Sequence, residues 1–288
     1  MKHQTSGCHG LRGFVQKPMV IAFVFALMLL ALGTPSEVQA VPVDLELILA
    51  ADVSGSIDST DFALQRAGFE SAFRSPAVIS GIESGAIGSI AVTLWDFANN
   101  VSVAVPFTVI SDGVSSNAFA DAVAAAPRPG SVGINDGQSN MINQALVALN
   151  SNGFEGTRSV LNIASEGAQD IDGCTFNNVD CPTVRAARDA FLAGGGTAIN
   201  AIWLNDRNFF GLDPTDLINA FEYGSLNVIG GPGSFQVFAA DFTAFGPAIE
   251  AKLIREIAPV PEPSGLLLLG SGLAAFGLWG RRGFKARS

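Results

Sequence analysis

Residues 47–56 read Leu-Ile-Leu-Ala-Ala-Asp-Val-Ser-Gly-Ser, an apolar run that ends at an acid and two hydroxyl side chains. An apolar run without polar alternation is typical of a central strand that is covered on both faces of a sheet. The run therefore predicts a buried strand over 45–51, with Asp52, Ser54 and Ser56 in the loop beyond its carboxyl end. In open α/β sheets, ligands bind at that end of the strands.

One carboxylate and two hydroxyl oxygens form a ligand set for a small, hard cation such as Mg²⁺, which takes few carboxylates and keeps several waters. The pattern Asp-x-Ser-x-Ser at Asp52, Ser54 and Ser56 resembles the first signature of the metal-ion-dependent adhesion site of von Willebrand factor A domains. The same residues also fit an Asx-type turn that caps the next helix. The motif alone leaves both interpretations open.

Strand and helix patterns alternate through residues 41–258, a length that suits one domain. This alternation indicates a mostly parallel sheet with helices on both faces, and the short link after residue 97 indicates a hairpin with an antiparallel edge strand. The expected fold class is α/β, the three-layer layout of the von Willebrand A domain. The predicted strands cover 45–51, 89–97, 101–108, 159–164, 198–203 and 227–229, and the predicted helices cover 60–74, 116–126, 139–149, 182–192, 214–221 and 240–257.

A metal at the end of the first strand needs ligands from further loops at the same edge of the sheet. The segment Asp136-Gly137-Gln138-Ser139 resembles the Gly-x-Thr loop of the family, with Ser139 in place of the threonine. By this resemblance, Ser139 supplies a hydroxyl ligand. A serine at a helix start is equally suited to be the cap of that helix.

A second loop, Ser165-Glu166-Gly167, follows the strand predicted over 159–164 and resembles the Thr-Asp-Gly of the family. The resemblance makes Glu166 a ligand, but its extra methylene leaves three alternatives: direct contact, contact through water, or a place outside the site. In the last case Ser165 carries the coordination. Asp170 and Asp172 either compensate for the change or belong to a solvated acidic loop.

The two ends of the chain have the composition of targeting segments. Residues 1–40 combine early basic residues, an apolar stretch and a Val-Gln-Ala site, which predicts a cleaved signal peptide, with a retained anchor as the alternative. Residues 259–288 contain Pro-Glu-Pro, an apolar span and a basic tail. This end resembles the PEP-CTERM sorting signal of Gram-negative bacteria, which implies processing by an exosortase-type protease. A plain C-terminal anchor is the alternative.

Charge and side-chain chemistry exclude several functions for residues 41–258. This segment holds 24 acidic and nine basic residues, a net charge near −15, which disfavours nucleic acid as a partner. Both histidines, His3 and His9, lie in the predicted signal peptide, so neither a zinc–histidine site nor a Ser-His-Asp triad fits. In an exported chain, Cys174 and Cys181 are expected to form a local disulfide.

The stretch from about residue 43 to 258 also resembles a bacterial family of von Willebrand A-like domains of unknown function. Its most distinctive part is Ile-Gly-Gly-Pro-Gly-Ser-Phe at 229–235, whose glycines and proline indicate a tight turn.

These features favour a binding module over an enzyme. The leading hypothesis is an exported, metal-dependent adhesion domain at the cell envelope or in the extracellular matrix. Its Mg²⁺, or Mn²⁺ or Ca²⁺, would bind an acidic group of a protein or matrix partner. One alternative is a structural matrix or envelope protein with a degenerate metal site. A hydrolase is the other, although the sequence holds no Gly-x-Ser-x-Gly elbow and no evident acid/base pair of carboxylates.

Overall fold

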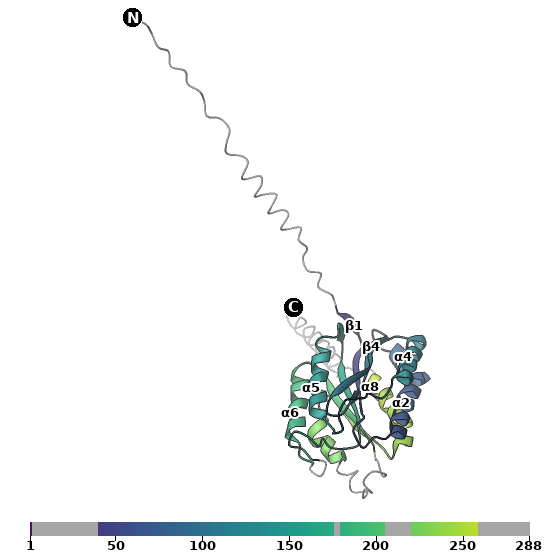
Figure 1. Ribbon diagram of the computed structural model, residues 1–288. Coiled ribbons are helices and arrows are strands. Elements are labelled where there is room, and N and C mark those ends of the chain that lie inside the picture. The colour runs from purple at the N-terminus through teal and green to yellow at the C-terminus, as the bar shows by residue number, and fades with distance from the viewer. Residues whose placement is uncertain (2–39, 176–178, 205–219, 259–288) are drawn as a thin grey trace, which may run out of the picture. The chain divides into compact units, whose positions relative to one another are not determined.

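The strand β2 (Leu45–Asp52) is the centre of the main sheet, and all eight of its residues are buried. The computed structural model describes Met1 and residues 40–175, 179–204 and 220–258 (Figure 1). On one side β2 pairs with β3 (Ile90–Phe97) and on the other with β6 (Ser159–Ser165), both in parallel. The apolar run therefore forms the fully covered central strand that the sequence predicts.

The six-stranded sheet has the order β4-β3-β2-β6-β7-β8. The parallel part continues through β7 (Ala198–Leu204) to β8 (Gln236–Ala239). At the other edge β4 (Val101–Ile110) is antiparallel to β3, which confirms the predicted hairpin. A separate two-stranded parallel sheet joins β1 (Val41–Val43) to β5 (Phe154–Gly156). Because β3, β2, β6, β7 and β8 are parallel neighbours, their carboxyl ends lie at one edge of the sheet.

Helices cover both faces of the sheet, which gives the predicted three-layer α/β fold (Figure 1). Leu45, Leu47 and Leu49 belong to the core on one face, whereas Ile48 and Ala50 belong to the core on the other. The first core lies under α2 (Ser59–Arg74), α3 (Pro76–Glu83), α4 (Gly113–Ala125) and α8 (Phe245–Ile257), and the second under α5 (Gln138–Leu149) and α6 (Pro182–Ala193).

One predicted strand is wrong. The segment expected as a strand over 227–229 contains the end of a π-helical turn, Gly224–Val228. The Asn227 amide donates to the carbonyl oxygens of Tyr223 and Val179, so this polar side chain is used to hold the turn. The sheet position is taken instead by β8, which the sequence analysis did not predict. Most of the helix predicted over 214–221 lies outside the described residues.

The side of the sheet under α8 contains a buried polar network. Glu256 Oε1 accepts hydrogen bonds from Lys252 Nζ at 2.5 Å and from Asn200 Nδ2 at 2.9 Å. Its second oxygen, Oε2, accepts from Asn162 Nδ2 at 2.7 Å. Burial lowers the pKa of Lys252 to about 8, although Glu256 opposes that shift. The network ties the last helix to β6 and β7.

The edge strand β4 is interrupted at Pro106. Val92 pairs with Thr108 and Leu94 with Val105, so two residues of β4 face one residue of β3 in a β-bulge. The Thr93 hydroxyl donates to the carbonyl oxygen of Val105 at 2.6 Å and closes this irregularity. Among the helices of the described segments, none is long and apolar enough to cross a membrane.

Candidate metal site at the carboxyl ends of the strands

Asp52, Ser54 and Ser56 lie together at the end of β2. The Asp52 side chain is 1% exposed, and its Oδ1 accepts a hydrogen bond from the Ser54 amide at 2.8 Å. The Ser54 and Ser56 hydroxyl oxygens are 3.2 Å apart. The predicted Asx-type turn is therefore present, but the helix cap is a different residue. Asp58 caps α2 by accepting from the amides of Thr60 and Asp61.

The Arg128 side chain holds the backbone of this loop by hydrogen bonds. Its guanidinium donates to four carbonyl oxygens: that of Val53 at 3.2 Å, Ser54 at 3.3 Å, Ile57 at 2.6 Å and Asp58 at 3.0 Å. The planar guanidinium presents several donors in a fixed geometry, so one side chain fixes the course of the backbone from 53 to 58.

A second carboxylate, Asp136, reaches the same place from the loop before α5. The Ser165 Oγ lies 2.8 Å from Asp52 Oδ2 and 2.8 Å from Asp136 Oδ2. The side-chain amide of Gln138 donates to Asp136 Oδ2 at 3.0 Å and to the carbonyl oxygen of Gly167 at 2.8 Å. Three loops, those after β2 and β6 and the one before α5, thus converge on two carboxylates.

The two carboxylates are held in an environment that disfavours their charge. Burial raises the pKa of Asp52, and burial together with the Asp52 charge raises the pKa of Asp136 well above its ordinary value. Asp136 Oδ1 has no hydrogen-bond partner among the described residues. No cluster of three or more His, Cys, Asp or Glu side chains suited to a metal occurs in the described ranges. The site instead offers two carboxylates and several hydroxyls, an oxygen-only donor set that fits a hard divalent cation.

Ser139 and Glu166 occupy the loops that the sequence predicted, with different contacts. The N-cap of α5 is Gly137, which makes no side-chain capping bond, so the alternative in which Ser139 caps this helix is wrong. The Ser139 amide donates to Gln169 Oε1 at 2.7 Å, and Ser139 is 7% exposed. Glu166 is partly buried directly after Ser165. The Ser165 hydroxyl makes the contact with Asp52 in this loop.

Of the two aspartates further along, Asp170 has contacts with the loop before α5. Asp170 Oδ1 accepts from the Asp136 amide at 2.8 Å, and its Oδ2 accepts from Asn135 Nδ2 at 3.1 Å. Asp170 therefore braces the loop that carries Asp136. Asp172 has a φ of 56°, a turn conformation. Neither of the two contacts of Asp170 is with Asp52.

Sequence reasoning missed Asp136, Gln138, Gln169 and Tyr223. The Tyr223 hydroxyl donates to Gln138 Oε1 at 3.0 Å and accepts from the Gln169 amide at 3.2 Å. Desolvation raises the pKa of Tyr223, so it remains a neutral hydrogen-bond donor. The sequence feature that could have pointed to Asp136 is the glycine that follows it, Gly137. A Cβ on Gly137 would lie 2.5 Å from the carbonyl oxygen of Ala98, which shows how tightly this loop packs on the end of β3.

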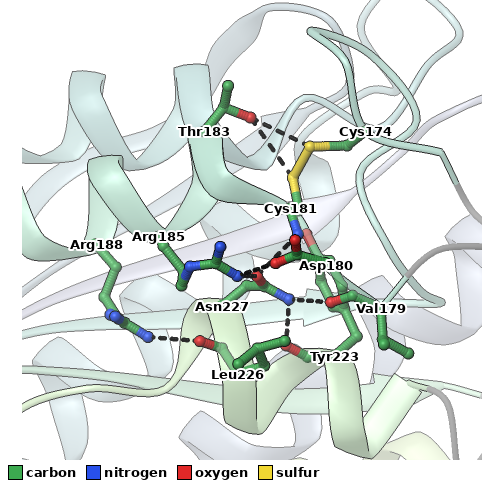
Figure 2. A network of polar contacts seen from close by, with 10 residues as sticks. All are labelled: Cys174, Val179, Asp180, Cys181, Thr183, Arg185, Arg188, Tyr223, Leu226 and Asn227. Atoms are coloured by element: carbon green, nitrogen blue, oxygen red, sulfur yellow. Dashed lines mark hydrogen bonds and ion pairs between the residues drawn. A yellow bond between two sulfur atoms is a disulfide. The ribbon is translucent and has the colours of Figure 1, made fainter.

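Tyr223 also belongs to a network of polar contacts around a disulfide, which Figure 2 shows. Cys174 and Cys181 form the predicted disulfide, with Cα atoms 5.2 Å apart. Asn227 Oδ1 accepts from the Cys181 amide at 3.0 Å and from Arg185 at 2.8 Å, while its amide donates to the Tyr223 carbonyl oxygen (Figure 2). The side-chain amide of Gln169 contacts Cys174 Sγ at 3.8 Å, and its Oε1 accepts a hydrogen bond from the Ser139 amide in α5. Gln169 therefore links the disulfide to this helix.

The sheet order, the antiparallel edge strand and the helices on both faces define the three-layer α/β layout that was expected for a von Willebrand A-like domain. Residues 42–261 match the model of the family described as protein of unknown function, DUF1194, and the chain belongs to this family. Residues 259–282 match the PEP-CTERM protein-sorting motif, as the sequence resemblance predicted. A comparison with curated proteins finds no match.

Several solved structures are similar to this chain at low sequence identity. The PilB minor pilin from Streptococcus sanguinis has a TM-score of 0.50 at 12% identity over 80% of this chain and 65% of its own. A von Willebrand factor type A protein from Catenulispora acidiphila has a TM-score of 0.44 at 13% identity, over 75% and 43%. Proximal thread matrix protein 1 from the mussel byssus, with a zinc-occupied MIDAS motif, has a TM-score of 0.47 at 14% identity, over 76% and 48%. The chain spans less than two thirds of each of these three proteins, and the similarity concerns the fold.

Proposed function

We propose that this protein is an exported, metal-ion-dependent binding module that recognises an acidic group on a protein or matrix partner. The observation that carries the proposal is the buried Asp52 carboxylate, which lies beside the Ser54 backbone in the loop that also holds the paired Ser54 and Ser56 hydroxyls. An ion held there by few protein ligands keeps open positions, and a carboxylate of the partner would fill one. Ser139 and Glu166 would complete the set, directly or through water, with Mg²⁺ as the first candidate ion and Mn²⁺ or Ca²⁺ as alternatives.

The ends of the chain support the exported location. The match to a sorting motif at 259–282 favours an address at the cell envelope or surface, with residues 1–40 as the signal peptide and residues 41–258 as the mature domain. On this proposal, membrane contact is confined to the C-terminal segment before an exosortase-type protease acts. Mass spectrometry of the exported chain tests this, since intact ends would contradict it.

The metal part is tested by calorimetric titration of Mg²⁺ and Mn²⁺ into the metal-stripped full chain. Asp52→Ala should abolish binding, because it removes the central ligand. Glu155→Ala is the matched control, since it removes the same charge from the exposed strand β5, at the opposite end of the domain. Binding that persists in Asp52→Ala would refute the proposed site.

A second candidate function is a structural envelope or matrix protein with a degenerate site. It is favoured by the Gln138 side-chain amide, which donates to Asp136 Oδ2 and to the carbonyl oxygen of Gly167. These hydrogen bonds satisfy part of the acceptors of the site without an ion. On that view Asp52→Ala lowers thermal stability and changes no binding. On the first view it removes the capture of immobilised acidic peptides in Mg²⁺ and leaves the fold intact.

A further inference from the structure

The Ser165 hydroxyl lies between two buried carboxylates. Its oxygen is 2.8 Å from Asp52 Oδ2 and 2.8 Å from Asp136 Oδ2. A serine hydroxyl carries one proton and donates one hydrogen bond. One of the two contacts therefore brings oxygen lone pairs together, unless a proton or a cation is shared at this point.

Asp136 also has an unused oxygen. Its Oδ2 accepts from Ser165 and Gln138, but Oδ1 has no partner among the residues of the described segments, although Asp136 is only 7% exposed. A buried carboxylate oxygen without a partner carries a free-energy penalty. A bound cation would remove that penalty and the conflict at Ser165 together.

The main chain holds Asp136 at this position. Its amide donates to Asp170 Oδ1 at 2.8 Å, and the adjacent Asn135 amide donates to Asn99 Oδ1 at 2.9 Å. The close packing of Gly137 on Ala98 fixes the following residue. Because its backbone is braced on both sides, the carboxylate faces Ser165 as part of the fold.

We propose that Asp136 is the second carboxylate ligand of the metal site and that the Ser165 hydroxyl bridges it to Asp52. This inference rests on the proposed function, since it assigns ligands to the same ion. It adds to Asp52 a second carboxylate, which comes from the loop before α5. Two carboxylates match the charge of a divalent cation, so we expect tighter binding than from one carboxylate, because ligand charge tunes affinity.

The test is titration of Mn²⁺ into the metal-stripped full chain, followed by electron paramagnetic resonance of the free ion. We expect Asp136→Asn to weaken Mn²⁺ binding by at least about tenfold, comparable with the loss of a strong supporting contact in metal sites. Asp52→Asn should have a similar or larger effect. Glu155→Gln is the matched control, because it neutralises a carboxylate on the exposed strand β5, and its dissociation constant should stay within about twofold of the wild type.

Thermal unfolding without metal separates a ligand from a purely structural residue. Asp136→Asn replaces a buried charge with a neutral group of the same size, so the metal-free midpoint should hold or rise, and the increase caused by Mn²⁺ should be lost. A lower metal-free midpoint with unchanged Mn²⁺ affinity would overturn the inference while leaving the Asp52 site in place. A wild-type chain that binds no Mn²⁺ would overturn both this inference and the proposed function.

Discussion

Arg128 is the residue whose contribution to the site is clearest outside the ligands. It donates to four carbonyl oxygens of the loop that carries Ser54 and Ser56. The loop contains no helix or strand, so its backbone conformation depends on these contacts and on the Asp58 cap that follows. The positions of the serine hydroxyls therefore depend on a side chain that is 74 residues away from Ser54 along the chain.

We expect Arg128→Ala to lower the free energy of unfolding by about 1 kcal/mol, the net value of one or two such hydrogen bonds at a partly exposed position. Metal affinity should fall more clearly, because the ligand loop loses its brace. Arg128→Lys should not restore it, since an ammonium group lacks the planar fork of donors. Urea unfolding and Mn²⁺ titration measure the two effects. Wild-type affinity in Arg128→Lys would show that charge alone suffices.

Residue-scale reasoning from the sequence found the parts of the site that one segment provides. Asp52, Ser54 and Ser56 follow a recognisable strand, so their place was predictable from the apolar run. Asp136 was not, because its role depends on contacts with Ser165 and Asp170 that are 29 and 34 residues away along the chain. Local patterns carry no information about which of several acids in loops becomes buried.

At the scale of elements, the disulfide loop supports one side of the site. The Cys174–Cys181 bridge, the π-helical turn Gly224–Val228 and α6 are joined through Asn227 and Arg185 (Figure 2). Tyr223, at the start of that turn, then contacts Gln138 in the first turn of α5. The loop is thereby connected to the Asp136 carboxylate by successive hydrogen bonds.

Replacing both cysteines by serine should lower the free energy of unfolding by about 2–3 kcal/mol, as expected for a short closed loop. Metal affinity should fall as well, because Gln138 and Gln169 lose part of their support. Denaturant unfolding and Mn²⁺ titration of Cys174→Ser/Cys181→Ser check both statements. Asp180→Ala, which removes the exposed ion pair with Arg185, is the control and should leave the affinity unchanged. Equal affinity in the double variant would separate the disulfide from the site.

Element prediction succeeded where apolar periodicity and caps agreed and failed where they conflicted. The pattern at Val228 and Ile229 favours a strand, but Asn227 uses its side chain to satisfy backbone groups of a turn. The β8 strand has only four residues, three of them partly exposed, so it lacks the buried run that marks β2 and β7. Edge elements of this kind are defined by their neighbours in the sheet.

At the scale of the whole molecule, the buried network around Lys252 makes stability depend on pH. Lys252 is the only lysine between Val41 and Ala258, and burial lowers its pKa to about 8 in the folded chain. An unfolded lysine titrates near 10.4, so between these values the unfolded state binds more protons than the folded state. The contribution of Lys252 to stability therefore rises with pH over this window.

We expect the free energy of unfolding to depend less steeply on pH between about 8 and 9.5 in Lys252→Met than in the wild type, because the variant lacks the titrating ammonium group. Thermal unfolding at a series of pH values measures the slope. The mean stability of the variant is not the readout, since Glu256 keeps Asn162 and Asn200 as donors but loses its cation. Parallel curves for the two proteins would show that Lys252 titrates normally.

The bulge at Pro106 has a consequence for molecules at high local density. Among the described strands β4 borders the sheet, and Val103 and Val109 are exposed on it. If this edge strand were flat and regular, its unpaired backbone groups could pair with the same strand of a neighbouring copy and join the two sheets. Pro106 has no amide hydrogen to offer, and the bulge twists the border away from regular register. Copies crowded together can therefore meet side by side without polymerising through their sheets.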